Sequence, residues 1–410
     1  MQEKKKISLT TKIVIALVLG VLAGAALQSN QHIAIDYIGP FGTIFLNLIK
    51  TIVVPLVMFS IAQGIISLKD IKKVGAIGGK TVAFYLCTTA GAITLGLIVA
   101  NMLGVGMGSN LELPQLGTYE GTVEMPSLMT TFVNIFPSNI INPMLNATML
   151  QVIVIAMFMG FGIISAGEKG KIVGDFVESA SEVCIKIMEM IIQLSPIGVF
   201  ALITPVVAQN GLSVLLPLIK LIGVVYLACA LHAVIVYSGA VKLIAKMGPI
   251  KFFKGMTPAM LFAFTSASSV GTLPFNLECT EELGADKEVA SFVLPLGATI
   301  NMDGTAIYQG VCAIFIAQIF GIDLTFSQQI TIILTATLAS IGTAGVPGSG
   351  VVMLTMVLQS VGLPLEGIGL VAGVDRILDM ARTTVNITGD AACTICVDAV
   401  ERRKKERLTA

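Results

Sequence analysis

Long runs of hydrophobic residues recur along the chain, separated by connections that hold most of the polar positions. A helix needs about 17–25 mainly apolar residues to cross the hydrocarbon layer of a bilayer. Eight runs are long enough, and they cover residues 12–28, 40–67, 74–104, 148–165, 176–209, 213–245, 288–320 and 365–399. We therefore expect an all-α polytopic membrane protein with eight transmembrane helices.

Two further apolar segments, residues 255–285 and 327–363, are interrupted in the middle by small polar residues, glycine and proline. The first interruption runs from Ser268 to Pro274, and the second from Ser340 to Gly348. Such breaks are typical of re-entrant hairpins, which enter and leave the bilayer on the same side. The alternative, two ordinary spans kinked at glycine and proline, stays open on these residues alone.

The positions of the charges orient these segments, because short cytoplasmic loops collect lysine and arginine. Twenty of the 25 lysines and arginines fall on one side of this layout. They lie before residue 13 and at 69–80, 169–171, 242–254, 287 and 402–407. Both termini are therefore predicted to be cytoplasmic, and the two hairpins to enter from opposite sides as an inverted pair. Paired interruptions of this kind indicate a transporter's binding site near the middle of the bilayer.

Composition excludes several classes of function. The chain is 55% hydrophobic and 12% charged, with zero formal net charge, which is far too apolar for a water-soluble fold of 410 residues. It has none of the clustered cationic character that nucleic-acid binding requires. His32 and His232 have no neighbouring nucleophile or metal-ligand pattern, so we expect no enzyme, and His232 is interpreted as an interior residue.

The 288–320 segment contains a run that cannot stay regular helix without cost. Residues 301–305 place an amide, a carboxylate and a glycine in its middle. At membrane depth, non-helical backbone is tolerated only where it is buried in protein or lines a cavity. Freed carbonyls, an amide and a carboxylate are hard oxygen ligands suited to an alkali cation. The run is therefore a candidate cation site, and a structural kink is the alternative.

The 365–399 segment carries five charges between residues 375 and 390. At about 2.5–3.5 kcal/mol each on the membrane-insertion scale, these charges are too costly for a helix that faces lipid. One set of polar residues follows at intervals of three or four, namely Asp375, Asp379, Arg382, Asn386 and Asp390. Because that spacing forms one stripe on a helix, we expect the stripe to face the protein interior.

The chemistry of this stripe fits a small zwitterionic anion. A guanidinium offers two parallel donors to a carboxylate, so Arg382 is suited to bind a carboxylate of a substrate. Asp379, one turn away, is able to accept a hydrogen bond from an ammonium group. Together they indicate an amino acid with a second carboxylate. The alternative is that Asp379 and Arg382 pair with each other for a structural purpose.

At these motifs the sequence resembles the dicarboxylate/amino acid:cation symporter family, which includes the excitatory amino acid transporters and prokaryotic aspartate transporters. The resemblance covers essentially the whole chain and is strongest from residue 264 to 392. It rests on the strings Gly271 to Pro274, Asn301 to Thr305, Gly342 to Gly348 and Arg382 to Asp390. Inverted repeats are a known feature of this family, so the resemblance is no independent test of that prediction.

The resemblance implies a homotrimer in the cytoplasmic (inner) membrane that works by an elevator mechanism. Each subunit would combine a scaffold, at about 12–67 and 148–209, with a mobile transport domain. The transport domain would comprise about 74–104 and 213–401, including both hairpins. The second hairpin would be the extracellular gate.

The resemblance also implies roles for the matching residues. Arg382 would bind the side-chain carboxylate of the substrate, and Asp379, assisted by Thr383, would bind its amino group. Further substrate contacts would come from Ser268, Ser269, Thr305, Val346, Gly350 and Asn386. Among these, Ser269 and Asn386 would hold the main-chain carboxylate.

Three sodium sites are implied in the same way. The first consists of the carbonyls of Gly297 and Asn386 with the Asp390 carboxylate. The second, mostly backbone carbonyls, consists of Thr299, Met302, Ser340, Ile341 and Thr343. The third consists of Tyr85, Thr88, Thr89, Asn301 and Asp303. Because the side chains that these sites need are present or conservatively replaced, sodium coupling is favoured over proton coupling.

The predicted function is sodium-coupled symport of L-aspartate or L-glutamate, with several sodium ions co-transported. Proton-coupled symport of the same amino acids and carriage of a four-carbon dicarboxylate remain alternatives, although a dicarboxylate would gain nothing from Asp379. Relatives often carry a further arginine at the first hairpin tip or one turn before the main arginine, where this chain has Ala267 and Met380. Arg376, a turn earlier, either supplies the same charge beside Asp375 or alters affinity and gating.

Overall fold

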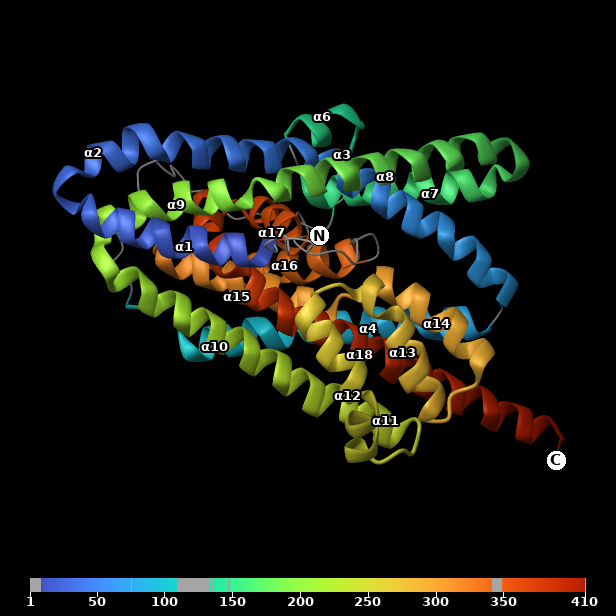
Figure 1. The fold of residues 1–410 in the computed structure, drawn as a ribbon. Helices are drawn as coiled ribbons and strands as arrows, with labels where there is room; N and C mark the ends of the chain where they lie inside the picture. The colour runs from blue at the N-terminus through green and yellow to red at the C-terminus, as the bar shows by residue number, and fades with distance from the viewer. Residues whose placement is uncertain are drawn as a thin grey trace, which may run out of the picture.

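The computed structural model shows a bundle of helices, and its described residues contain no β-strand (Figure 1). The structure describes residues 9–74, 76–108, 133, 136–146, 148–340 and 349–409. The last and longest helix is α18 (Ile368–Thr409), with 42 residues. The prediction of an all-α fold is therefore confirmed over the described residues.

One set of helices packs around α3 and α9. The set consists of α1 (Leu9–Ala26), α3 (Gly39–Val74), α7 (Met149–Ser165), α8 (Lys171–Gln193) and α9 (Ser195–Asn210). Short helical turns accompany them, namely η1 (Gln28–Asn30), α2 (Gln31–Ile33), η2 (Ala34–Ile38), α6 (Ile141–Leu145) and η3 (Gly167–Gly170). Helix α3 contacts α7, α8 and α9, while α1 runs along α9.

Small residues make the contact between α1 and α9 close. Gly20 and Gly24 are one helical turn apart on α1, and a Cβ added at Gly24 would lie 2.7 Å from the backbone oxygen of Thr204. Spacing of this kind lets two helices approach in a membrane, where van der Waals packing replaces the hydrophobic effect as the force between them.

A second set of helices packs around α15 and α18. The set consists of α4 (Ala76–Leu103), α10 (Leu215–His232), α14 (Lys287–Ile300), α15 (Asp303–Ile319) and α18. Its connecting turns include η4 (Gly211–Val214), η5 (Ala233–Tyr237), α11 (Ser238–Leu243) and η7 (Leu365–Gly367). Helix α15 packs against α4, α10 and α18, and every residue in it except Gln318 is buried. A helix buried on all sides offers no face to lipid, so α15 forms the core of this set.

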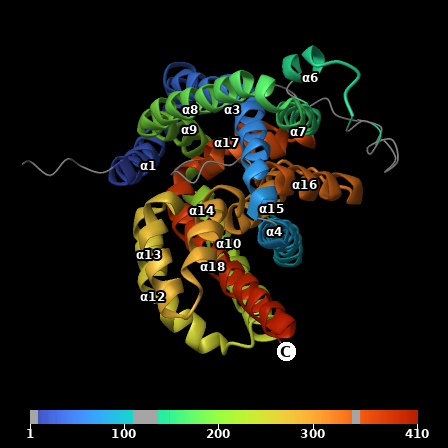
Figure 2. The same cartoon turned by 90° about the vertical axis from the view of Figure 1, so that its right-hand side faces the viewer.

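Two helical hairpins complete the fold (Figure 2). Helices α12 (Pro249–Ser266) and α13 (Ser269–Glu282) pack against each other and are joined by Ala267 and Ser268. Ala267 adopts left-handed backbone with φ of +51°, which ends α12, and the Ser268 hydroxyl accepts a hydrogen bond from Gly271 N at 3.0 Å, which begins α13. Helices α16 (Phe326–Ala339) and α17 (Ser349–Ser360) also pack together. A packed helix pair thus stands where each hairpin is expected, and that the two pairs re-enter the bilayer, and from which sides, stays a prediction.

Several described helices are able to cross a membrane. Three stretches are long and apolar enough by themselves, namely Gln28–Ile66, Ile77–Leu103 and Leu215–Leu243. Gly167–Gln193 and Ser195–Gln209, bent by 51° at their junction, make a fourth if they are one span. The other expected crossings do not meet this criterion because α1 and α7 are short, residues 301–302 interrupt one segment, and α18 carries the charged stripe. The number eight therefore stays a prediction.

Candidate substrate and cation site

The charged stripe of α18 faces the interior, as its spacing predicts. Asp375, Asp379, Arg382, Asn386 and Asp390 are each between 1% and 8% exposed. Helices α10, α12, α14, α15 and α17 all pack against α18 and cover it. The prediction that the stripe is buried is confirmed, and its charges must therefore be compensated inside the protein.

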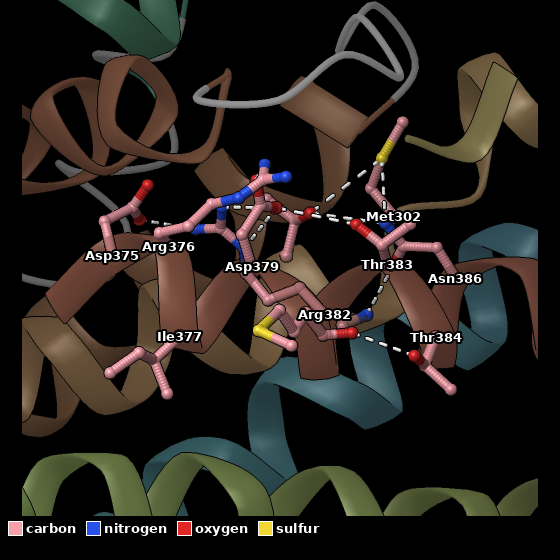
Figure 3. A network of polar contacts seen from close by, with 12 residues as sticks. Met302, Asp375, Arg376, Ile377, Asp379, Arg382, Thr383, Thr384 and Asn386 are labelled. Carbon is pink, nitrogen blue, oxygen red and sulfur yellow. Dashed lines mark hydrogen bonds and ion pairs between the residues drawn. The ribbon is translucent and has the colours of Figure 1, made fainter. Parts of the chain in front are cut away.

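Arg382 lies between two carboxylates of its own helix (Figure 3). Its Nη2 is 2.6 Å from Asp379 Oδ1, and its Nη1 donates to Asp375 Oδ1 at 3.0 Å. The ring of Tyr308, from α15, lies against the guanidinium, with its centre 4.2 Å from Cζ. The pairing of Arg382 with Asp379 that the sequence left open is thus present. Asp375 is a second partner that the sequence reasoning did not assign, although its spacing of seven residues from Arg382 is two helical turns.

Glycines on two other helices allow Arg382 to fit. Gly350, at the start of α17, lies against the guanidinium, because a Cβ added there would overlap Nη1 and Cζ. Gly304, in the first turn of α15, lies against the backbone of Arg382, where a Cβ would overlap the carbonyl oxygen. Gly350, a predicted substrate-site residue, is thus brought to Arg382.

Asn386 connects α18 to the first turn of α15. Its Oδ1 accepts a hydrogen bond from Gly304 N at 2.8 Å, and its Nδ2 donates to Thr305 Oγ1 at 3.4 Å. Thr383, nearby on α18, donates through Oγ1 to Asp379 Oδ1 at 3.5 Å. The structure therefore joins Asn386 to Thr305 and Thr383 to Asp379, and the substrate roles of these residues stay predictions.

The predicted residues of the hairpin tips have different surroundings. Ser269 is buried at the first position of α13, and Ser268 caps that helix. Ser340, at the end of α16, donates to the Thr337 carbonyl at 2.7 Å. Other predicted residues of the second tip lie outside the described residues, namely Ile341, Thr343 and Val346. The roles of all these tip residues stay predictions.

Asp390 and Asn301 meet at the break between α14 and α15. The break is non-helical at residues 301–302, as predicted. Asn301 Nδ2 donates to Asp390 Oδ1 at 2.8 Å and to the Asn386 carbonyl at 3.0 Å. Gly297 leaves room beside them, since a Cβ added there would lie 2.5 Å from Asp390 Oδ1. The residues predicted for the first sodium site are thus gathered in one place.

Asp303 is fully buried and accepts hydrogen bonds from two other helices. Thr89 Oγ1, from α4, donates to Oδ1 at 2.6 Å, and the Tyr237 hydroxyl donates to Oδ2 at 2.8 Å. His232 Nε2 lies 3.2 Å from Oδ2, and the burial predicted for this histidine is confirmed. Sequence reasoning missed Tyr237 and His232 as neighbours of Asp303. The sequence signal is two polar rings five residues apart in an apolar segment. In the structure His232 directly precedes η5 and Tyr237 ends it, and π-helical turns of this kind often mark functional sites.

Three predicted sodium ligands have side chains engaged elsewhere. The Tyr85 hydroxyl donates to the Val293 carbonyl at 3.1 Å, and Thr88 Oγ1 donates to the Tyr85 carbonyl at 3.2 Å. Thr299 is exposed and donates to the Leu296 carbonyl of its own helix at 2.9 Å. The structure does not bring the Thr299 side chain to the other ligands, which leaves its backbone carbonyl as the predicted ligand.

The donor chemistry of these groups suits sodium. Asn301 Oδ1 is buried and has no hydrogen-bond partner among the described residues. Met302, another predicted ligand, accepts a hydrogen bond from Asn386 Nδ2 at its sulfur, 3.3 Å away. Within the described part of the chain no three His, Cys, Asp or Glu residues cluster as a metal site. Carboxylate, amide and carbonyl oxygens are the ligands of hard cations, so the residues present fit sodium.

Comparisons with known proteins identify the family of the chain. The sequence model of the sodium:dicarboxylate symporter family matches residues 9–400. The chain is 40% identical over 408 residues to the proton/sodium-glutamate symport protein of Geobacillus stearothermophilus, covering 98% of this chain and 96% of that protein. It is 38% identical over 412 residues to the proton/glutamate-aspartate symporter of Escherichia coli (strain K12), covering 97% and 94%. It is 34% identical over 412 residues to the C4-dicarboxylate transport protein of Paracidovorax citrulli, covering 98% and 90%.

Proposed function

The chain belongs to the sodium:dicarboxylate symporter family, and from this premise we propose that it carries L-aspartate or L-glutamate across the cytoplasmic membrane together with sodium ions. The protein is an integral multi-pass membrane protein and a cation-coupled symporter of glutamate and aspartate or of C4-dicarboxylates, not an enzyme. The proposal adds the substrate, the coupling ion and the mechanism.

The observation that carries the substrate proposal is Arg382 held between Asp375 and Asp379. Breaking a buried ion pair is costly when it leaves one charge without a partner. An acidic amino acid avoids this cost, because its side-chain carboxylate accepts from Arg382 while its ammonium group donates to Asp379. A C4-dicarboxylate brings no such donor to Asp379. A substrate that carries both charges therefore replaces both halves of the Arg382–Asp379 pair and leaves neither side chain without a partner.

Two buried carboxylates support the coupling of transport to cations. Asp303 and Asp390 are 0% and 1% exposed, and neither has a lysine or arginine partner among the described residues. His232, 3.2 Å from Asp303, carries an opposite charge only when its imidazole is protonated. A buried charge without an opposite charge is unfavourable, and a bound cation removes that cost. With the unpartnered oxygen of Asn301 nearby, we propose sodium as this cation. Protonation of the same carboxylates is the alternative, because the names of some relatives include both the proton and sodium.

The packing pattern supports an elevator mechanism. Helices α3, α7, α8 and α9 contact one another, as expected for a scaffold at about 12–67 and 148–209. Helices α15 and α18 pack with each other and with α4, and α18 also packs with the α12–α13 hairpin, as expected for a transport domain at about 74–104 and 213–401. Trimer assembly, cytoplasmic termini and gating by the α16–α17 hairpin belong to the same proposal.

Uptake into vesicles containing the purified protein tests the proposal. Aspartate, glutamate, succinate and serine are each supplied under an inward sodium gradient or an inward proton gradient. We expect sodium-driven uptake of aspartate or glutamate and none of serine. Preferential uptake of succinate would show that the substrate is a C4-dicarboxylate. Uptake that needs only the proton gradient would show that the coupling ion is the proton.

A further inference from the structure

Arg376 of α18 reaches two groups at once. Its Nη2 donates to the carbonyl oxygen of Ser266 at 3.0 Å. Its Nη1 lies 3.6 Å from Asp379 Oδ2, and Figure 3 shows the two side chains on α18. Its side chain is 17% exposed, so the guanidinium is mostly enclosed. Arg376 therefore links the α12–α13 hairpin to the carboxylate that pairs with Arg382.

The hairpin end of this link is a helix terminus. Ser266 is the last residue of α12, and the carbonyls of a last turn have no partner further along their own helix. Ala267 then takes left-handed backbone and the chain reverses into α13. The aligned peptide dipoles give the end of α12 a partial negative charge, which attracts a guanidinium. Arg376 thus holds the chain where the hairpin turns.

The other end of the link belongs to the substrate cluster. Asp379 Oδ1 pairs with Arg382, whereas Oδ2 faces Arg376, so two guanidiniums take different oxygens of one carboxylate. With Asp375 included, the cluster holds two positive and two negative side chains and is electrically balanced. A single side chain therefore ties the position of the hairpin tip to the group predicted to accept the substrate's ammonium.

We propose that Arg376 is a positioning residue that holds the first hairpin tip, with Ser268 and Ser269, in the geometry that binds substrate. The identity of the substrate rests on the proposed function, whereas the link between the tip and α18 does not. Without the link, the tip occupies its binding position for only part of the time. The dissociation constant then rises in inverse proportion to that fraction, so a tip in place for about a tenth of the time binds about tenfold more weakly.

Three variants of the full-length protein test this inference. Arg376→Gln removes the link. Arg376→Lys keeps the charge but lacks the planar fork that reaches both acceptors. Arg402→Gln is the matched control, because Arg402 also lies on α18 and donates to a carbonyl at the other end of the same hairpin, that of Gly284, at 2.6 Å.

Two measurements are made on each variant, namely hydrogen–deuterium exchange of the α12–α13 tip and the dissociation constant of L-aspartate in sodium. We expect Arg376→Gln to weaken aspartate binding about tenfold, because affinity falls with the fraction of time that the tip is in place. Tip exchange should speed up at least about tenfold, because exchange rises with the fraction of time that the tip is out of place, which is small in the wild type. Exchange in α7 should not change. Arg376→Lys should recover part of both effects, and Arg402→Gln should produce neither.

Unchanged tip exchange in Arg376→Gln overturns the inference, whether or not the protein binds aspartate. Weaker binding with unchanged exchange also overturns it, since charge alone then accounts for the loss. A wild-type protein that binds no aspartate refutes the proposed function, while the exchange measurement still decides the link. Should Arg376→Gln misfold, faster exchange in α7 reveals it. Arg376→Lys then decides the link, since intermediate tip exchange supports the inference and wild-type exchange overturns it.

Discussion

Replacing Gly350 with alanine should displace the guanidinium of Arg382 while leaving the fold intact. The added Cβ would overlap Nη1 and Cζ of Arg382, which are the far end of a flexible side chain, so the backbone does not have to move. The guanidinium itself is not free to move without loss. It is held by Asp375 at 3.0 Å, by Asp379 at 2.6 Å and by the Tyr308 ring at 4.2 Å. Displacement therefore costs part of these contacts.

The size of the effect of Gly350→Ala on aspartate binding follows from the overlap between the added Cβ and the guanidinium of Arg382. An extra methyl group in a packed interior costs about 1–3 kcal/mol. If Arg382 binds the substrate carboxylate, this cost falls on substrate binding, where about 1.4 kcal/mol corresponds to a factor of ten in the dissociation constant. We therefore expect the dissociation constant of L-aspartate to rise about 5- to 150-fold in Gly350→Ala. The midpoint of thermal unfolding should fall by no more than a few degrees, because a loss of about 1–3 kcal/mol shifts it only slightly in a chain of this size.

Isothermal titration of the purified protein in sodium, with thermal unfolding in parallel, measures both quantities. Gly223→Ala is the matched control, because a Cβ at this helical glycine meets no atom within 4 Å. Gly304→Ala should instead lower the midpoint of thermal unfolding strongly, because its Cβ would overlap the backbone of Arg382, which cannot swing aside as a side chain does. Wild-type aspartate affinity in Gly350→Ala would refute the role of Arg382 as the carboxylate ligand.

Three further predictions address separate parts of the site. Arg382→Lys keeps the buried charge but loses the planar fork, so uptake of acidic amino acids into vesicles should fall at least about tenfold; uptake at the wild-type rate would exclude a bidentate contact. Asp303→Asn and Asp390→Asn remove buried negative charge and should weaken sodium binding. The rise in unfolding midpoint that sodium produces should therefore be smaller, since it grows with the ratio of the sodium concentration to its dissociation constant. The full rise in both variants would refute the coupling proposal. Asp379→Asn should weaken aspartate binding more than succinate binding in a competition assay, and equal losses would show that Asp379 accepts no ammonium.

Features with local causes could be predicted from the sequence. The break at residues 301–302 follows from polar residues and a glycine placed together in an apolar run. The buried stripe of α18 follows from helical spacing and from the cost of charge in lipid, which together leave only an inward orientation. The turn at Ala267 and Ser268 is also local, because the serine side chain caps the helix that follows it. The resemblance to known transporters then supplied roles that no local pattern contains.

The sequence by itself thus determined the helical class, the breaks and the inward face of α18, because each depends on neighbouring residues in one segment. Only the tertiary structure decided which groups meet. Asp303 lies 71 and 66 residues from His232 and Tyr237, and Arg376 lies 110 residues from Ser266. Helical periodicity relates residues within one element only. Contacts between elements depend on how whole helices pack, and that packing is the sum of many small interactions spread along the chain.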